Sequence, residues 1–477
     1  MANPIKADIC VIGGGSAGLS VAAGAAQMGA RTVLIESGQM GGDCLNTGCV
    51  PSKSLLAAAH AAHCARNGQP FGIKPGPSEI DFQGVHDHIH GVIASIAPHD
   101  SQERFEDLGC TVLRAPGHFI DDRTVEAGDT RIMARRFVIA TGSRAAVPPI
   151  PGLGDTPHHT NESIFDLQDL PSHLVIIGAG PIGCEMAQAF RRLGSEVTLL
   201  DMASMMPRDD QDAVAVVRQA FTDVGITVTE GISIERVEKA ADGIAVILQG
   251  DALKGSGHIK GSHLLIAAGR RPNVENLGLD QAGIMFSPKG IDVDDRLRTS
   301  NRRVFAAGDV AGGPQFTHWA GYHAGIIIRN ALFRLPAKVD MRALPWVTYT
   351  DPELAQVGLT ERDARERFGD AVKVLHAPFA DNDRARAERR VEGFVKAVVD
   401  KRGRILGATI VGPHAGELIQ TWGLAISSGL KIGKLAGMIA PYPTLGEINK
   451  RAAGSYFTPT LFSARTRWLV RMLGRLG

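Results

Sequence analysis

Short apolar runs, most of them followed by glycine, recur along the chain and predict buried parallel strands. The first run covers residues 9–12 and leads into the sequence GGGSAG, after which small and apolar residues continue to Ala30. A second run, RTVLIE, ends at Glu36. Buried strands of parallel sheets are continuously apolar, and glycine adopts the strained conformations of the turns between elements. Residues 7–36 are therefore predicted to form a strand, a glycine-rich turn, a helix and a second strand.

The glycines of this turn have the G-x-G-x-x-G spacing of a dinucleotide-binding fold. The first glycine allows the tight turn, the second lets the backbone approach a pyrophosphate, and the third lets the helix pack against the strand. The helix N-terminus offers N–H groups and partial positive charge to the phosphates. A carboxylate at the end of the second strand can hold ribose hydroxyls. The predicted residues of this site are Gly13, Gly15, Gly18 and Glu36.

The pattern recurs in HLVIIGAGPIGCEMAQAFRRLGSEVTLLD, which predicts a second dinucleotide site and therefore two cofactors, one resident and one visiting. Its residues are Gly178, Gly180, Gly183 and Asp201. A carboxylate at the position of Asp201 pairs with free ribose hydroxyls and repels a 2′-phosphate, so we expect NADH to be preferred over NADPH. Arg208, further downstream, is the residue that could favour NADPH instead.

Two apolar strands end in matching dipeptides and predict crossings between the nucleotide domains. RRFVIATGS ends at Thr141-Gly142 and is followed by a proline-rich linker, and HLLIAAGRRPN ends at Ala268-Gly269. A further short strand, in 302–310, ends at Gly308-Asp309. From Trp346 onward the pattern changes to strands, hairpins and a helix in AGELIQTWGLAISSGL, which predicts a separate α+β domain.

Composition narrows the class of protein. The chain has 477 residues, of which 44% are hydrophobic and 21% charged, so we expect a soluble globular protein of two to four domains. A net charge of +1 gives no general attraction to nucleic acid. We expect no signal peptide and no transmembrane helix. Six cysteines in a chain of this size do not form a secreted disulfide framework, so reducing cytosol is the expected compartment.

The sequence GGDCLNTGCVPSK contains the candidate chemistry. Pro51 suits the first turn of a helix, which places Cys49 at the helix N-terminus, where the dipole lowers a thiol pKa. Lys53 adds positive charge one turn on, and Cys44 lies in the preceding loop. The alternatives are a structural disulfide and half of a zinc site, but no second Cys or His pair stands at a suitable spacing. An asymmetric pair favours redox chemistry.

From residue 6 to 460 the chain resembles the FAD-dependent pyridine nucleotide–disulfide oxidoreductases, which include dihydrolipoamide dehydrogenase, glutathione reductase and mercuric reductase. The motifs that carry the resemblance occur in the family's order: GGGSAG, GGDCLNTGCVPSK, ATGS, GAGPIGCE, AAGRRPN, AAGDV and PYPTLGE. The resemblance implies an α/β fold with two Rossmann-like dinucleotide-binding domains and a C-terminal α+β dimerisation domain. The implied boundaries are 1–150 (first part of the FAD-binding domain), 151–270 (NAD(P)-binding domain), 271–345 (second part of the FAD-binding or central domain), 346–457 (dimerisation domain) and 458–477 (basic amphipathic tail).

The resemblance also implies roles for individual residues. Cys49 is the thiol that touches the flavin, Cys44 exchanges with substrate, and Lys53 pairs with Glu185 beside the flavin. The dimerisation domain lends residues to the partner's active site, so a homodimer is implied. The implied FAD contacts are Gly13, Gly15, Gly18, Glu36, Lys53, Gly117, Thr141, Gly142, Ser143 and Asp309. The implied NAD contacts are Gly178, Gly180, Gly183, Asp201 and Gly269.

One position departs from the pattern of the disulfide-reducing members. In those enzymes the dimerisation domain supplies a His, followed five residues later by Glu, and the His exchanges protons with substrate thiols. Here Tyr442 stands in place of that His, and Glu447 is kept. A phenol of pKa near 10 mostly donates its proton, whereas imidazole near 6.5 cycles protons at neutral pH. Mercuric reductases carry Tyr here, but this chain has no cysteine after Cys184 and so lacks their C-terminal cysteine pair.

We therefore predict a flavoenzyme that passes electrons from NAD(P)H through FAD and Cys44–Cys49 to a metal ion or small-molecule acceptor. Dihydrolipoamide dehydrogenase or another disulfide reductase is the alternative enzyme, and a redox-sensing or partner-docking flavoprotein with little turnover is the alternative of another class. His318 and the cluster of His86, His88 and His90 are interpreted as structural or surface residues. Four cysteines are interpreted as small buried residues, namely Cys10, Cys64, Cys110 and Cys184.

The C-terminal tail, residues 458–477, has apolar residues near one helical face and four arginines that no acid balances. The pattern predicts a helix that packs on the dimer, or one that contacts a membrane surface or a partner. The expected location is therefore cytoplasmic, with a peripheral membrane contact as the second alternative. The apolar residues are Leu461, Trp468, Leu469, Met472, Leu473 and Leu476, and the arginines are Arg465, Arg467, Arg471 and Arg475.

Overall fold

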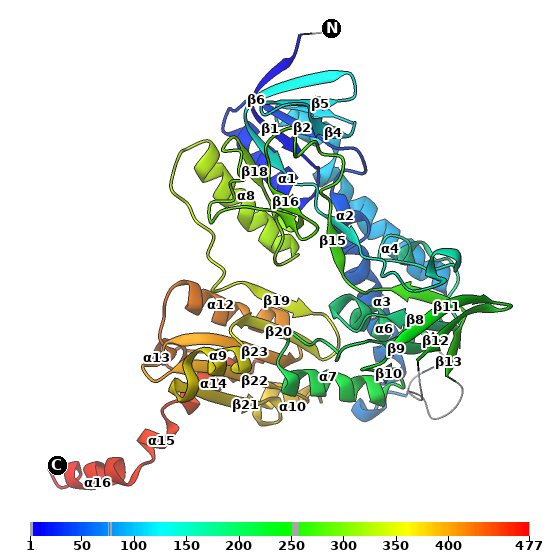
Figure 1. The fold of residues 1–477 in the computed structure, drawn as a ribbon. Coiled ribbons are helices and arrows are strands. Elements are labelled where there is room, and N and C mark those ends of the chain that lie inside the picture. Colours follow the sequence, from blue (N-terminus) through cyan, green and yellow to red (C-terminus); the bar gives the residue numbers. More distant parts are fainter. Residues whose placement is uncertain (1–2, 75, 77–78, 250–256, 477) are drawn as a thin grey trace. The chain divides into compact units, whose positions relative to one another are not determined.

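The computed structural model describes residues 3–74, 76, 79–249 and 257–476, and its chain divides into two compact units (Figure 1). The first unit comprises Met1–Ala179, Ala189–Met202 and Ile232–Val339. The second comprises Gly180–Gln188, Ala203–Gly231 and Asp340–Gly477. The expected α/β class is confirmed, whereas the five expected domain boundaries stay predictions.

The main sheet of the first unit has seven strands. Its order is β3-β2-β1-β6-β5-β4, and β18 pairs with β6. β1, β2, β3, β6 and β18 run parallel to one another, while β5, paired with β6, and β4 add an antiparallel edge. The strands are β1 (Ile5–Ile12), β2 (Thr32–Ile35), β3 (Cys110–Leu113), β4 (Gly117–Phe119), β5 (Thr124–Ala127), β6 (Thr130–Ile139) and β18 (Val304–Ala306).

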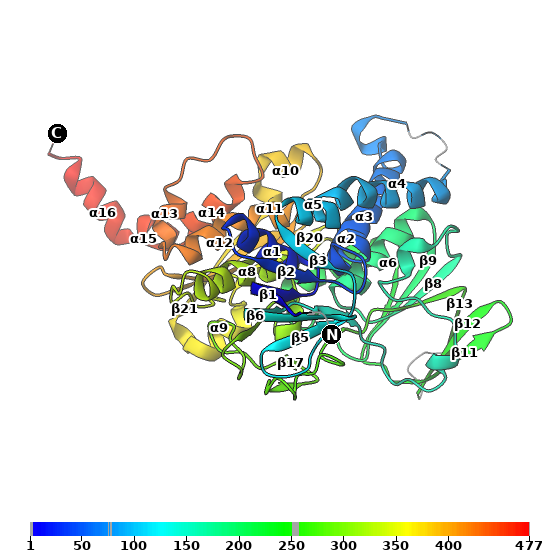
Figure 2. The same cartoon turned by 90° about the horizontal axis from the view of Figure 1, so that it is seen from above.

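Two helices cover one face of this sheet because their small residues allow close packing. α1 (Ser16–Gln27) is rich in alanine and glycine and packs against α8 (Thr317–Ala331), and both contribute to one apolar core with residues of the sheet. Three further helices carry or adjoin the cysteine motif: α2 (Gly42–Asn46), α3 (Cys49–Arg66) and α4 (Phe82–Ile96). α4 packs along both α2 and α3, as Figure 2 also shows for α3. α5 (Gln102–Asp107) packs on β3.

A second parallel sheet repeats the nucleotide-binding pattern. In it β8 (His173–Ile177) pairs with β9 (Glu196–Leu200) and with β14 (His263–Ile266), and α6 (Pro181–Leu193) connects the first two. An antiparallel sheet follows, formed by β11 (Ile234–Ala240), β12 (Gly243–Leu248) and β13 (His258–Gly261). The expected crossing segments pair as a ribbon, β7 (Ser143–Ala145) with β15 (Arg270–Pro272). A small hairpin joins β16 (Phe286–Ser287) and β17 (Gly290–Ile291).

The second unit is built on a five-stranded antiparallel sheet of order β19-β20-β23-β22-β21. Its alternating burial produces an apolar core with Trp422, which is fully buried and donates to Asn449. The strands are β19 (Pro345–Thr348), β20 (Glu353–Gly358), β21 (Val372–Pro378), β22 (Phe394–Asp400) and β23 (Ile405–Gly412). The other elements are α7 (Gln211–Asp223), β10 (Thr227–Thr229), α9 (Glu361–Phe368), α10 (Asp383–Ala387), α11 (Ala415–Leu418), α12 (Gln420–Ser427), α13 (Ile432–Ala436), α14 (Glu447–Ser455), α15 (Thr458–Leu461) and α16 (Ala464–Leu473).

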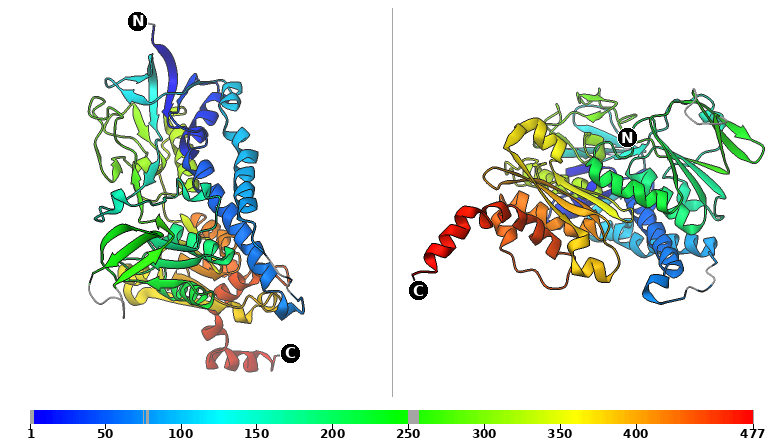
Figure 3. Two further views of the ribbon diagram at one scale, coloured as in Figure 1. Left: turned by 90° about the vertical axis from the view of Figure 1, so that its right-hand side faces the viewer. Right: turned by 90° about the horizontal axis from the view of Figure 1, so that it is seen from below.

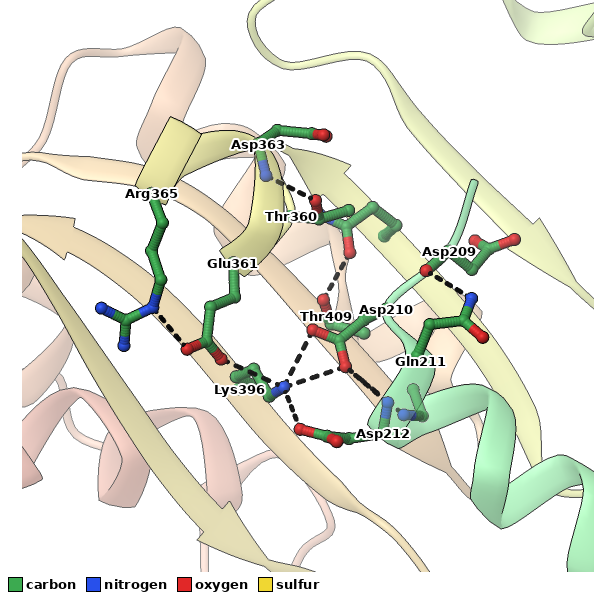
Figure 4. Close-up of polar contacts among 12 residues, drawn as sticks. Asp209, Asp210, Gln211, Asp212, Thr360, Glu361, Asp363, Arg365, Lys396 and Thr409 are labelled. Atoms are coloured by element: carbon green, nitrogen blue, oxygen red, sulfur yellow. Dashed lines mark hydrogen bonds and ion pairs between the residues drawn. The ribbon is translucent and has the colours of Figure 1, made fainter. Parts of the chain in front are cut away.

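A buried lysine joins α7 to this sheet (Figure 4). Lys396 of β22 is 4% exposed, and its ammonium donates to Asp210 at 2.9 Å and to Asp212 at 2.6 Å. Glu361 lies 3.3 Å away. Burial opposes the charge of Lys396, but the hydrogen bonds to Asp212 and Asp210 outweigh it and raise its pKa. Removing Lys396 would leave the buried Asp210 carboxylate without its ammonium partner, so this contact ties the start of α7 to β22.

Short 3₁₀ helices complete both units. They are η1 (Gln69–Phe71), η2 (Ala97–Asp100), η3 (Leu153–Asp155), η4 (Ile164–Asp166), η5 (Gly308–Ala311), η6 (Gly369–Ala371) and η7 (Phe379–Asp381).

The single helix expected in AGELIQTWGLAISSGL is broken at Ile419 into α11 and α12. The side chain of Asn449 donates to the Leu418 carbonyl at the break, which satisfies a backbone group that the helix leaves open.

One cysteine expectation is wrong. Cys10, Cys110 and Cys184 are buried as expected, but Cys64 is exposed. It lies in the last turn of α3, where the helix presents this position to solvent, and its sulfur is 3.4 Å from Nε2 of His60.

The C-terminal tail forms two short helices, α15 and α16. Figure 3 shows α16 extending away from the sheet of the second unit in both views, and none of its residues is buried. Trp468 on this helix is 57% exposed. Among the described residues, no helix has the length and apolar character needed to cross a membrane. Contact of the tail with a membrane surface or a partner stays a prediction.

Candidate functional site

The first glycine-rich turn has the shape that a bound dinucleotide needs. A Cβ atom on Gly13 would lie 2.3 Å from the Ala140 carbonyl oxygen, and one on Gly18 would lie 1.8 Å from the Gly13 oxygen. Gly15 caps α1, and no side chain caps the helix, so its first N–H groups face the turn without a side-chain acceptor. Glu36, at the end of β2, accepts from the N–H groups of Gly14 and Gly38. These residues fit the pyrophosphate and ribose of FAD.

The second glycine-rich turn has the same construction. Gly178 has φ +114°, and a Cβ atom on it would lie 2.4 Å from the Ala267 oxygen. Asp201 ends its strand and accepts from the Ala179 N–H at 2.6 Å, as Glu36 does in the first turn. Gly180 and Gly183 stand at the start of α6, and Gly269, directly before β15, has φ +118°. Gly178 and Asp201 thus repeat the construction of the first turn, whereas the second dinucleotide site and the preference for NADH stay predictions.

The cysteine pair lies at the junction of α2 and α3. Cys44 is in α2 and half-buried, whereas Cys49 is the first residue of α3 and exposed, and both are free thiols. The Cys49 sulfur lies 3.3 Å from the Thr317 hydroxyl at the start of α8. A hydrogen bond from Cys44, the Thr317 hydroxyl and the charge of Lys53 outweigh the partial desolvation of the sulfur and lower the pKa of Cys49 to about 6. The same hydrogen bond, with burial, raises the pKa of Cys44.

This asymmetry has a chemical consequence. A pKa near 6 keeps Cys49 mostly as thiolate at neutral pH, and a thiolate is the reactive form of cysteine. Cys44 keeps its proton and donates a hydrogen bond to that thiolate. The structure thus brings together Cys44, Cys49 and Lys53 in one segment with one ionised sulfur and one protonated sulfur, which is the state expected of a reduced redox pair.

A measurement of alkylation rate against pH tests this charge distribution. In reduced protein, the rate at which iodoacetamide modifies Cys49 should rise through about pH 6 and level off by about pH 7.5, because the lowered pKa makes thiolate available above it. Cys44→Ala should move the midpoint upward because the hydrogen-bond donor is lost. Cys44→Ser, which keeps a donor, should move it less. A midpoint near 8.5 in the unmodified protein would contradict the assignment.

A polar network behind the pair links it to Asp309. The Arg270 guanidinium lies 3.1 Å from the Asp43 carboxylate and donates to the Ser143 hydroxyl at 2.8 Å, and that hydroxyl donates to Asp309. Burial raises the pKa of Asp309. Asn161 donates to the other Asp43 oxygen at 3.0 Å. The network fixes α2, which carries Cys44 where a loop was expected, and it orients Asp309, the residue implied to hold FAD.

Sequence reasoning missed several of these residues. Arg270, Asp43 and Thr317 lie within or beside quoted motifs, yet their partners are remote in the chain, and Thr317 is 268 residues from Cys49. His323 was also missed, and its ring accepts from the Gly308 N–H beside Asp309. Burial lowers the pKa of His323 to about 4, so the ring is neutral. His318, in contrast, is exposed and stacks on Phe316.

The structure places the other predicted site residues in several different elements. Gly117 begins β4, and a Cβ atom there would contact Ile35. Thr141 donates to the Asn273 carbonyl, and Gly142 has φ +68° before β7. Glu185, in the second unit, accepts from the Tyr349 N–H at 3.0 Å, while Lys53 is in the first unit. The ion pair expected between Lys53 and Glu185 stays a prediction.

The position of the missing histidine is well defined in the second unit. Tyr442 is 70% exposed, and its hydroxyl donates to the Asp383 carboxylate at 3.1 Å. That hydrogen bond raises the pKa of Tyr442 above its ordinary value. Glu447 begins α14, and its carboxylate accepts from the Thr444 N–H at 3.5 Å. The phenol therefore keeps its proton at neutral pH and can donate but not accept one.

Comparisons with known proteins agree with this architecture. Residues 7–324 match the pyridine nucleotide-disulphide oxidoreductase family, and residues 344–453 match that family's dimerisation domain. The mercuric reductase of Bacillus cereus is 37% identical over 92% of this chain and 70% of its own length. The dihydrolipoyl dehydrogenase of Geobacillus stearothermophilus is 34% identical over 94% of this chain and 96% of its own.

A solved structure extends the likeness to three dimensions. The HOCl-induced flavoprotein disulfide reductase from Escherichia coli, solved as a Cu(II) complex, has a TM-score of 0.84 and 29% identity over 93% of this chain and 98% of its own. The two nucleotide turns, the paired cysteines and the C-terminal domain thus occur together in the family's order. The chain therefore belongs to the pyridine nucleotide-disulphide oxidoreductases, flavoproteins that use FAD and NAD(P)H, carry a redox disulfide and form dimers through the C-terminal domain.

Proposed function

We propose that this chain oxidises NADH and reduces a thiol-binding metal ion, such as Hg(II) or Cu(II), at the Cys44–Cys49 pair. The observation that carries the proposal is Tyr442, which stands where disulfide-reducing relatives are expected to place a histidine. Its phenol donates to Asp383, and its pKa is raised, so it cannot take a proton from a substrate thiol at neutral pH. Loss of an acid–base group costs about 10²–10⁴-fold in rate.

Reduction of a metal ion does not need that group. Thiolates bind soft metal ions directly, and the protons of the thiols leave to water when the metal binds. The overall reaction balances as NADH plus Hg(II) giving NAD⁺, H⁺ and Hg(0), or as NADH plus two Cu(II) giving NAD⁺, H⁺ and two Cu(I). Mercuric reductase is the name of the Bacillus cereus relative, and the Escherichia coli structure is a Cu(II) complex, which supports this class of acceptor.

The roles of the chain's own residues follow from the site. Gly13, Gly15, Gly18 and Glu36 would hold the pyrophosphate and ribose of FAD, with Asp309 and Ser143 as further contacts. Bound FAD would supply the electron pair that passes from NADH to the disulfide. Cys49 is the thiol assigned to the flavin, and Cys44 is the thiol assigned to the acceptor. The other implied contacts are Lys53, Gly117, Thr141 and Gly142 for FAD, Gly178, Gly180, Gly183, Asp201 and Gly269 for NADH, and Glu185 beside Lys53.

A dihydrolipoamide dehydrogenase-like activity is the alternative enzyme. The Geobacillus stearothermophilus relative supports it, and the dithiol itself can exchange with a disulfide. The alternative differs from the proposal in its demand for a proton acceptor at position 442. A redox-sensing flavoprotein differs from both because it would show flavin reduction without turnover.

Anaerobic reduction with NADH or NADPH, followed by a panel of acceptors, tests the proposal. We expect kcat/KM with NADH to exceed that with NADPH by about 10²-fold, because Asp201 repels a 2′-phosphate. We expect Hg(II) or Cu(II) to be reduced, and lipoamide and glutathione disulfide to be reduced at least about 10²-fold more slowly. Equal rates on lipoamide, or no turnover with any acceptor, would overturn the proposal in favour of one of the two alternatives.

A further inference from the structure

We propose that His86 and His90 form a second metal-binding site, for a divalent ion that imidazole ligates, such as Cu(II). The binding itself is independent of the proposed reduction. Only a role in supplying ions to Cys44 rests on the proposed function. The sequence pattern HDHIH shows the spacing but not which of its histidines cooperate.

The helix brings two of the three histidines together. α4 is continuous from Phe82 to Ile96, so residues four apart lie on one face. The ring centroids of His86 and His90 are 4.2 Å apart with planes inclined at 45°. His88 lies two residues from each and is exposed. Two imidazoles one turn apart on a helix are a recurring metal-ligating arrangement.

The ring of His86 is prepared to act as a ligand. Its Nδ1 atom lies 3.2 Å from the Asp87 carboxylate, and the side-chain nitrogen of Gln83, 3.3 Å from Nδ1, donates to the same carboxylate at 2.8 Å. When Nδ1 donates to the carboxylate, the proton is fixed there, and Nε2 carries the free lone pair that a metal needs. A carboxylate behind a histidine in this way orients the ring and increases its basicity.

The ring of His90 supplies the second lone pair. Its Nε2 atom is shielded from solvent and has no hydrogen-bond partner in the part of the chain that the structure describes. A carboxylate oxygen of Asp166, in η4, lies 3.6 Å from that atom, beyond hydrogen-bond distance but close enough to attract a cation. A shielded nitrogen that lacks a hydrogen bond and lies at ion-pair distance from a carboxylate requires an explanation, and a bound ion is one.

The site is a two-ligand site. No group of three or more His, Cys, Asp or Glu side chains suited to a metal ion occurs among the described residues. Water therefore fills the remaining positions, which keeps the ion exchangeable. Imidazole ligates Cu, Ni and Zn, and Cu(II) binds most tightly of the divalent first-row ions, so the expected order is Cu(II) above Ni(II) and Zn(II), with Mn(II) weakest.

The proposed metal site and the cysteine pair lie in the same unit, the first. α4 packs against α2, which carries Cys44. The segment that holds Asp166 begins near Asn161, which donates to Asp43, the residue before Cys44, and to the Thr47 carbonyl. The five-residue step from Asn161 to Asp166 spans at most about 17 Å, which limits the distance between the proposed metal site and the segment of Cys44. A weakly held ion on His86 and His90 therefore raises the local concentration of acceptor near Cys44.

Copper binding to the FAD-loaded protein tests the site. The background is Cys44→Ser, Cys49→Ser and Cys64→Ser, which removes the reducing pair and the exposed thiol. Equilibrium dialysis against CuCl₂ and the nitrogen hyperfine pattern in EPR report on imidazole ligation. His86→Ala and His90→Ala should each weaken the tightest Cu(II) site at least tenfold, whereas His88→Ala, on the same helix, should leave it unchanged. His90→Gln serves as a second variant should His90→Ala fail to fold.

Each outcome decides one part of the proposal. Unchanged Cu(II) binding in both His86→Ala and His90→Gln, or an equal loss in His88→Ala, would overturn the site. In protein with its cysteines intact, His90→Gln should raise KM for Cu(II) severalfold and leave kcat unchanged. Loss of binding with an unchanged KM would remove the supply role and leave the site. The dialysis measurement needs no turnover, so it holds even where the proposed metal reduction fails.

Discussion

Replacement of Cys44 by serine is expected to lower metal-ion reduction by about 10³-fold or more while NADH still reduces the bound FAD. Cys44 is half-buried and protonated in the reduced pair, and it is the thiol assigned to the acceptor. Serine has a similar volume and can still donate to Cys49, so the fold and the Cys49 thiolate should persist. Only the second sulfur, and with it the ability to form a disulfide, is removed.

The measurement separates the two halves of the reaction. Anaerobic stopped-flow absorbance follows flavin reduction by NADH, and steady-state NADH consumption with Hg(II) or Cu(II) follows the acceptor half. The matched control is Cys64→Ser, because Cys64 is an exposed thiol in the neighbouring helix α3 that has no part in the site. Full acceptor reduction in Cys44→Ser would show that electrons reach the metal without this thiol.

The sequence predicted the site best where chemistry and local structure coincide in a short segment. Pro51 and the helix-forming residues after it placed Cys49 at the start of a helix, and α3 begins at that residue. The glycine spacing placed two nucleotide turns at the ends of apolar strands, as the structure has them. In these cases the pattern of a few neighbouring residues determines the geometry.

The rest depended on contacts between distant residues. The hydroxyl of Thr317 that faces Cys49, and the link from Arg270 to Asp43, join segments more than 200 residues apart, and no local pattern indicates them. The solvent exposure of a side chain is also hard to predict from its residue type. Cys64 was expected to be buried because cysteine usually is, but it is exposed because of its position in the last turn of α3. The partner of Tyr442 was likewise hidden, since Asp383 lies 59 residues away.

The second large effect concerns acceptor choice. Tyr442→His is expected to raise kcat/KM for lipoamide or glutathione disulfide by about 10²-fold or more, because imidazole can take and return a proton near neutral pH. The side chain at position 442 is exposed, so the substitution opens no cavity. Asp383, which now accepts from the phenol, and Glu447, which begins α14, supply carboxylates that hold an imidazole in place and favour its charged form.

The pH dependence of disulfide reduction identifies the cause of a gain in kcat/KM by Tyr442→His. Disulfide reduction by Tyr442→His should follow a group that titrates near pH 6.5–7.5, whereas the low rate of the unmodified protein should show no such dependence. Tyr442→Phe is the matched control, because it removes the hydroxyl and the bond to Asp383 without adding a base, and it should gain nothing. If Tyr442→His keeps its metal-ion activity but remains as poor with disulfides as Tyr442→Phe, the residue at 442 does not set the acceptor. The choice between metal ion and disulfide must then be made within the first unit, around Cys44 itself.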